Sequence, residues 1–163
     1  MKNNSTSDAK RELLRHGLAT LAYRGGKTIR NAPPAFADFS ASEGTRTPGN
    51  ILAHIGDLLD WGQSIAAGKQ AWKDSKPLSW EKESERFFEA LKRFDEYLGS
   101  SEPLHATPEK LLQGPIADAL THVGQIAMLR RMAGSPVRGE NYFQAEVTVG
   151  RVGAEQAPPK REF

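Results

Sequence analysis

Apolar residues recur every three or four positions through four segments of the chain, a pattern that predicts four amphipathic helices. The first helix is expected over about residues 6–30, after a run of side chains that cap helices well. Gly25 and Gly26 weaken its pattern, and Pro33 and Pro34 end it. A loop is expected to follow before the pattern resumes.

The other three helices have clearer beginnings. The second is expected over residues 48–68, with Thr47 as its cap and a proline at its first position. The third, over residues 79–99, repeats aromatic residues and leucine at helical spacing, which is typical of a face packed in a core. The fourth is expected over residues 108–133, bent near Pro115.

Four long helices and little else predict an all-α fold, a four-helix bundle that forms a single domain over residues 1–163. The tail, residues 137–163, contains proline, glycine and alternating polar and apolar residues. We expect it to be irregular, either forming a short extended piece or lying along the bundle.

Composition narrows the possible chemistry. The chain has no cysteine, so a disulfide, a thiolate ligand and a cysteine nucleophile are excluded, and a metal would need His, Asp, Glu or carbonyl ligands. The net charge is only +2 and the basic residues are scattered, which argues against nucleic-acid binding. The polar amino terminus and the interrupted apolar stretches predict a cytoplasmic protein without a secretion signal or a membrane span.

Two of the four histidines carry little functional signal. His16 is expected at the surface or half-buried on the first helix. Glu102 and His105 match the Glu-x-x-His spacing of carboxylate-bridged di-iron bundles. Pro103 and the loop-like surroundings argue against the helix that this motif requires, and the chain has no second copy of it. We therefore do not expect a di-iron site.

His122 has a more informative neighbourhood. Asp118 precedes it by four residues and Gln125 follows it by three, so the three side chains share one face of the fourth helix. Leu129 lies on the same stripe, so Asp118 is expected to point at or near the apolar interior. A buried carboxylate needs a cation, a hydrogen-bond network or a metal. A simple Asp–His hydrogen bond within one helix is the alternative.

His54 lies in the middle of the apolar pattern of the second helix, either as a core histidine or as a ligand from a facing helix. Two imidazoles and one carboxylate, with open positions for water and substrate, form a recognised catalytic arrangement. Asp57, one turn later, is expected to accept from an imidazole N–H, to be an alternative ligand, or to be a solvated or helix-pairing acid.

Two segments carry a family resemblance: "RTPGNILAHIGDLLDW" at residues 46–61 and "IADALTHVGQIAMLRRMAGSPV" at residues 116–137. They resemble the DinB/YfiT-like superfamily of metal-binding four-helix bundles, over about two thirds of the chain. The family pattern has one His on the second helix, then a His-x-x-x-His pair followed by Gly-Gln, an apolar run and a Leu-Arg ending. His54 and His122 match its first and last histidines, and Asp118 stands where the family usually has the middle one.

The resemblance implies an up-down-down-up bundle with a long crossover between the second and third helices, and often a homodimer. It also implies a divalent metal (Zn, Ni, Mn or Fe) held by His54, Asp118 and His122. Gln125 and Asp57 are then candidates for positioning a ligand.

The function expected on this basis is a metal-dependent enzyme acting on a small molecule, with hydrolase or thiol S-transferase chemistry. Tyr142, Phe143 and Glu146 of the tail are candidates to border its pocket, with packing as the favoured alternative for the two aromatic residues. The alternative is a non-catalytic binding or dimerisation protein with a vestigial site, a reading favoured by Asp118 in place of histidine.

Overall fold

The computed structural model describes the backbone of residues 2–163 and the side chains of residues 8–163, and this part of the chain is all-helical, as predicted. Its regular elements are α1 (Lys2–Ile29), a short 3-10 turn η1 (Phe36–Asp38), α2 (Pro48–Ala66), α3 (Trp80–Gly99), α4 (Pro108–Leu111), a π-helical turn η2 (Leu112–Ile116) and α5 (Ala117–Met132). Within the described residues, no helix is both long enough and apolar enough to cross a lipid bilayer.

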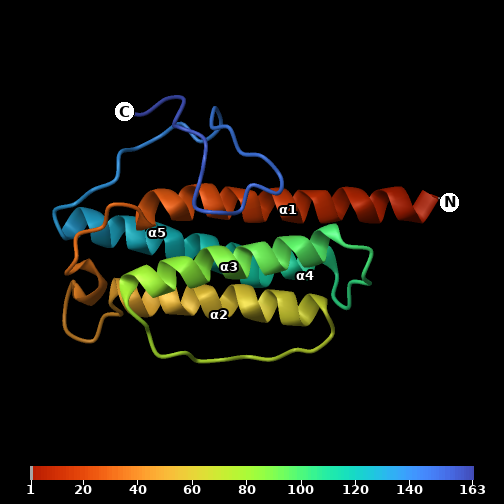
Figure 1. Ribbon diagram of the computed structural model, residues 1–163, viewed down its shortest axis with the longest axis horizontal. Coiled ribbons are helices and arrows are strands. Elements are labelled where there is room, and N and C mark those ends of the chain that lie inside the picture. Colours follow the sequence, from red (N-terminus) through yellow and green to blue (C-terminus); the bar gives the residue numbers. More distant parts are fainter. Residues whose placement is uncertain (1) are drawn as a thin grey trace.

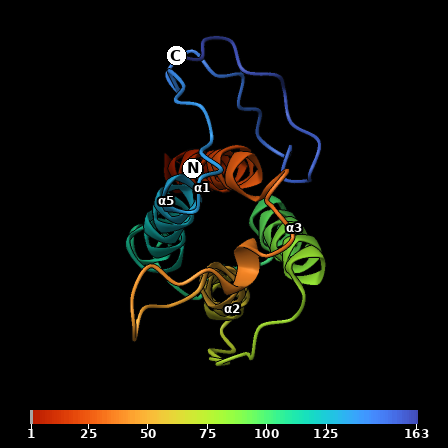
Figure 2. The same cartoon turned by 90° about the vertical axis from the view of Figure 1, so that its left-hand side faces the viewer.

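The four long helices lie around one apolar core (Figure 2). Both α1 and α2 pack against α3 and α5. In Figure 1, α2 and α3 run in the same direction, while α1 and α5 run in the opposite one. The link between α2 and α3, residues 67–79, therefore passes back along the length of α2 before α3 begins.

Side-chain caps fix where three of the helices begin. Thr47 accepts from the backbone N–H of Asn50 at 3.3 Å, which starts α2. Ser79 and Thr107 cap α3 and α4 in the same way, each accepting from the backbone N–H three residues later. These starts agree with the sequence prediction, because the capping residue is a local signal.

Pro115 is accommodated by a change in helix type. It lies in η2, where α4 passes into α5 through wider π-helical turns. The ring is buried against α2, where a Cβ added to Gly62 would lie 3.0 Å from its Cβ atom. At the place where a bend was expected, near Pro115, the helix therefore has a π-helical turn. This turn places the start of α5 just before Asp118.

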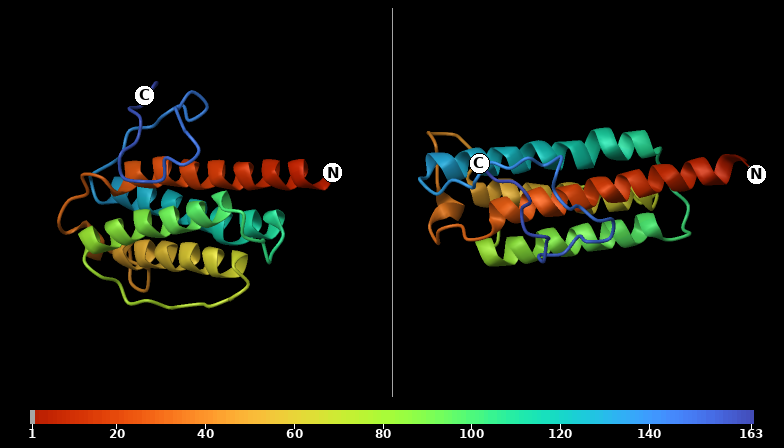
Figure 3. Two further views of the ribbon diagram at one scale, coloured as in Figure 1. Left: turned by 45° about the vertical axis from the view of Figure 1, so that its right-hand side comes forward. Right: turned by 90° about the horizontal axis from the view of Figure 1, so that it is seen from above.

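The tail after α5 folds back over α1 and α3 (Figure 3), with one isolated antiparallel bridge between Glu140 and Glu162. Lys27 of α1 binds both of these carboxylates, at 2.7 and 2.8 Å. The Tyr23 hydroxyl donates to Glu140 at 2.5 Å. Buried polar contacts therefore hold the tail on the side of α1 that faces away from α2 (Figure 2).

Close packing of α1 on α3 depends on Gly25. A Cβ there would lie 2.5 Å from Cζ of the buried Phe87 ring, whereas a Cβ at Gly26 would lie 3.4 Å from Cζ of Phe88. We expect Gly25→Ala to lower the free energy of unfolding by about 1–3 kcal/mol through overpacking. Gly26→Ala is expected to leave it unchanged or raise it by up to about 1 kcal/mol, since alanine favours the helix. Urea denaturation measures both, and equal stabilities would contradict this packing.

Candidate metal centre

His54 of α2 and Asp118 and His122 of α5 come together where the two helices pack. One ligand atom from each lies within 4.8 Å of the other two, so the group could hold a metal ion. The imidazole rings of His54 and His122 pack edge to face, with 4.8 Å between their centroids. Nε2 of His122 lies 3.4 Å from Oδ1 of Asp118. The three residues selected from the sequence thus form one cluster.

The orientation of the His122 ring is set by Gln125. The Oε1 atom of Gln125 lies 2.8 Å from Nδ1 of His122. A carbonyl oxygen can only accept, so Nδ1 is the donor, and Nε2 is the ring nitrogen that faces Asp118. This is the positioning role expected for Gln125, and it leaves Nε2 free to bind a metal.

Asp118 is more exposed than the sequence suggested, with 48% of its side chain accessible to solvent. The buried stripe of α5 runs through Ala119, Val123 and Ile126. Asp118 and His122 therefore lie on the flank of that stripe, and of the expectation that Asp118 points at or near the apolar interior only the second part holds. Because Asp118 is half exposed, its charge does not need a nearby cation to offset burial. The case for a metal therefore rests on the close approach of Asp118 to the two imidazoles.

His54 is partly buried among aromatic rings. Its ring lies 5.6 Å from that of Trp72, which in turn lies 5.7 Å from that of Trp61, both edge to face. Burial, together with His122 and the charge of Arg46, lowers the pKa of His54 below its ordinary value. His54 is therefore neutral near pH 7, the state that a metal ligand requires.

Trp72 was missed at the sequence level because the link between α2 and α3 has no periodic pattern. It comes from residues 67–79, which pass along α2 and bring the indole against His54. The only sign of this contact in the sequence is the presence of a tryptophan in the mostly polar run "KQAWKDSKPLS". Its ring packs edge to face against the His54 ring at the site.

Asp57 is a helix-pairing acid, one of the alternatives expected for it, and its carboxylate is bound by Ser75 and Arg86 instead of an imidazole. Its side chain is buried, Oδ2 accepts from the Ser75 backbone N–H at 2.8 Å and Oδ1 accepts from the Ser75 hydroxyl at 2.7 Å. The Arg86 guanidinium of α3 donates to Oδ1 as well. Asp57 therefore fastens the link and α3 to α2, and through the link it holds Trp72 near His54.

The Asp57 contacts predict a pH-dependent loss of stability. Burial alone would raise its pKa, but the hydrogen bonds from Ser75 and Arg86 prevail and lower the pKa below 3.8. The folded state then binds fewer protons than the unfolded chain, so this stabilisation is present above pH 3.8 and is lost as the pH falls through the folded-state pKa.

We expect Asp57→Asn to lower the free energy of unfolding by about 3 kcal/mol at pH 7, because Arg86 loses its buried partner. The difference from the unchanged protein should shrink at pH 3, because Asp57 is mostly protonated in the unfolded chain below pH 3.8 while the folded state resists protonation. The half-buried Asp60 provides the control, and Asp60→Asn should cost less than about 1 kcal/mol at either pH. A difference that is the same at both pH values would refute the assignment.

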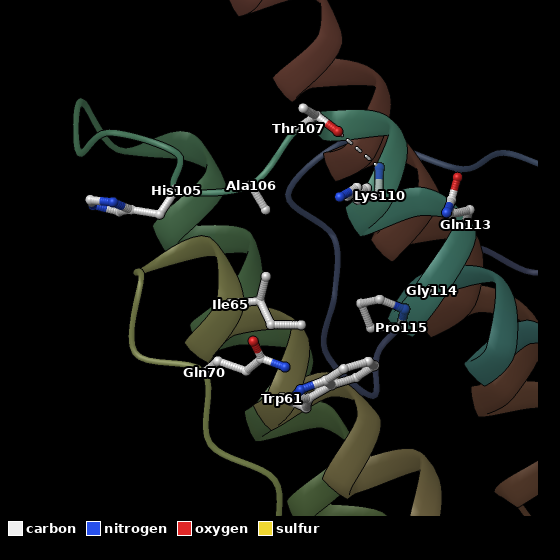
Figure 4. Close-up of a pocket in the computed structure, with 10 residues that line it drawn as sticks. All are labelled: Trp61, Ile65, Gln70, His105, Ala106, Thr107, Lys110, Gln113, Gly114 and Pro115. Atoms are coloured by element: carbon white, nitrogen blue, oxygen red, sulfur yellow. Dashed lines mark hydrogen bonds between the residues drawn. The ribbon is translucent and has the colours of Figure 1, made fainter.

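The other two histidines lie outside the cluster. His16 is exposed on α1, as expected. His105 is exposed in the non-helical segment before α4, which removes the helix that a di-iron motif with Glu102 would need. Figure 4 shows its ring pointing away from Trp61 and Lys110, which line the same hollow of about 550 Å³.

The donor set of the cluster suits a divalent ion. Metal–ligand bonds of about 2.1 Å place tetrahedral ligand atoms roughly 3.4 Å apart. The His122–Asp118 separation of 3.4 Å is already at that spacing, and the other separations are at most 4.8 Å. Two nitrogens and one carboxylate oxygen fit Zn, Ni, Mn or Fe(II).

Searches with this chain against protein-family models, curated proteins and solved structures found no match. Interpretation of the site therefore depends on its own geometry and chemistry.

Proposed function

We propose that the chain is a metal-dependent enzyme of the DinB/YfiT-like type, with a divalent ion held by His54, Asp118 and His122. The observation that carries the proposal is the approach of three donor atoms from two facing helices to within 4.8 Å of one another. The parallel α2 and α3 helices, joined by a long link, are what an up-down-down-up four-helix bundle of this type requires (Figure 1).

Hydrolysis or thiol S-transfer is the chemistry that this donor set supports best. A divalent ion supplies Lewis-acid polarisation and lowers the pKa of water and thiols. Three protein ligands leave room for a small-molecule substrate. Gln125 holds His122 in the tautomer that this needs, and the exposed Asp118 leaves one side of the group open to solvent. One carboxylate against a divalent ion leaves the group positive, which favours anionic substrates.

A direct test is turnover by protein loaded with zinc, nickel or manganese. The substrates are p-nitrophenyl acetate for hydrolysis and 1-chloro-2,4-dinitrobenzene with a low-molecular-weight thiol for transfer. We expect at least one reaction to be lost on chelation, restored by returning the metal, abolished in His122→Ala and unchanged in His16→Ala. Stoichiometric metal binding without either reaction would contradict the enzymatic proposal.

The half-exposed Asp118 favours one other candidate, a non-catalytic bundle with a vestigial site. A solvated carboxylate is stable without a metal, so the cluster does not require one in order to fold. This candidate predicts neither turnover nor tight metal binding. The homodimer implied by the family resemblance stays a prediction, and sedimentation analysis measures it.

A further inference from the structure

An apolar pocket lies directly beside the proposed metal group. It has a volume of about 370 Å³ and lies between α5 and the segment that leads into α2. Ala41, Ile51, Met128 and Leu129 provide its apolar lining. This volume falls in the range of small-molecule sites, which are mostly apolar with a few polar groups that fix orientation.

The pocket has one charged lining residue, Arg46. This residue is exposed, and among the side chains that the structure describes its guanidinium forms no ion pair. Arg86 and Arg93, by contrast, are paired with carboxylates of α2. Arg46 is near enough to His54 for its charge to help lower the pKa of that imidazole. An unpaired guanidinium at an apolar pocket is suited to bind a carboxylate through two parallel hydrogen bonds.

Two residues connect the pocket with the metal group. Gln125 lines the pocket and also binds Nδ1 of His122 at 2.8 Å. Ile51 lies one helical turn before His54 on the same face of α2. The larger hollow in Figure 4 differs, because Gln125 does not line it.

We propose that this pocket is the substrate subsite, and that it takes a small molecule with an apolar body and a carboxylate bound by Arg46. The apolar body packs on Ile51, Met128 and Leu129, and the carboxylate lies at the guanidinium. The proposal deepens the metal-dependent function proposed above and rests on it for the chemistry, but the binding itself depends on residues outside the metal ligands.

The methionines provide a local readout of binding. The chain has three, and Met128 lines the pocket while Met132, one turn later, lies outside it. With 13C-methyl methionine in the full chain, hexanoate is titrated into metal-free protein. We expect a saturable shift of the Met128 methyl signal with little change at Met132. The neutral analogue 1-hexanol should bind at least about 10-fold more weakly, because it lacks the charge-assisted contact.

Arg46→Gln should weaken hexanoate binding by about 10-fold or more and leave 1-hexanol unaffected, because only the carboxylate contact is lost. Arg131→Gln is the matched control: Arg131 is an exposed arginine of α5 outside the pocket, and its variant should bind hexanoate like the unchanged protein. Equal weakening by both variants, or no shift of Met128, would overturn the subsite.

A zinc titration of the same samples keeps the two proposals separate. Zinc affinity should be the same in Arg46→Gln as in the unchanged protein. Arg46-dependent hexanoate binding in protein that binds no zinc would support the subsite and refute the metal function. Zinc binding without any response of Met128 to hexanoate would refute the subsite alone.

Discussion

Replacing Arg130 with methionine is expected to lower the free energy of unfolding by about 3 kcal/mol. Arg130 is 4% exposed and joins the ends of α1 and α5. Nη1 donates to the carbonyl oxygens of Thr28 and Arg30, each at 2.9 Å, and Nη2 donates to that of Asn31 at 3.2 Å. Nε donates to the carbonyl oxygen of Ser135 at 2.8 Å. Methionine would leave these acceptors without their donor.

The loss should be specific to the guanidinium. Arg130→Lys keeps the charge but cannot reach oxygens on both sides, so an intermediate loss is expected. Arg131→Met, at the exposed neighbouring position, should change stability by less than about 0.5 kcal/mol. Thermal and urea denaturation measure all three variants. If Arg130→Met and Arg131→Met unfolded alike, the guanidinium would not have the structural role assigned to it.

Replacing His122 with alanine is expected to weaken zinc binding by more than about 100-fold, because a ligand contributes more than the outer partners that cost 10–100-fold. His54→Ala should have the same effect, since each removes one of three donors. His16→Ala, a histidine exposed on α1, is the matched control and should bind zinc like the unchanged protein.

Gln125→Ala separates positioning from ligation. Because Gln125 holds the His122 ring without being a ligand, its loss should weaken zinc binding by about 10-fold, less than the loss of either imidazole. Titration with a competing chelator measures the zinc affinity of each of these four variants and of the unchanged protein. A Gln125→Ala variant as defective as His122→Ala would instead point to direct ligation by the amide.

The helices were predictable because their signals are local. Thr47, Ser79 and Thr107 each cap a helix whose start the sequence places correctly. The Gly25–Gly26 pair weakened the pattern of the first helix without interrupting α1, which continues to Ile29. Glycine at position 25 leaves room for the Phe87 ring of α3, which lies close to the backbone of α1. This contact joins distant parts of the chain, so helix propensity alone does not reveal it.

The candidate site was predictable in part for the same reason. Spacing alone placed Asp118 one turn from His122, and the position of His54 on a facing helix made it the third candidate, which the family resemblance then supported. The depth of Asp118 was misjudged, because a residue on the flank of a buried stripe has the same spacing as one within it. Trp72 and the buried Asp57–Arg86 pair depend on where an aperiodic link packs, which its sequence does not encode locally.

The placement of the tail also depends on contacts between distant parts of the chain, so its local sequence did not predict it. Tyr142, Phe143 and Glu146 do not lie at the metal group, and the packing favoured for the two aromatic residues holds for Tyr142 but not for Phe143. Tyr142 packs on Tyr23 and Arg24 of α1, while Phe143 is 97% exposed. Glu146 pairs with basic residues within the tail. The buried carboxylate of Glu140, bound by Lys27, determines this placement.

Metal content tests the central claim most directly. The full chain, purified without a metal-affinity tag, is analysed for zinc, nickel, manganese and iron before and after dialysis against a chelator. We predict one divalent ion per chain, removable by the chelator and regained from solution, and none in the His54→Ala/His122→Ala double variant. The unchanged protein failing to bind any of these ions stoichiometrically, or the double variant keeping its metal, would contradict the assignment of His54, Asp118 and His122 as a metal site.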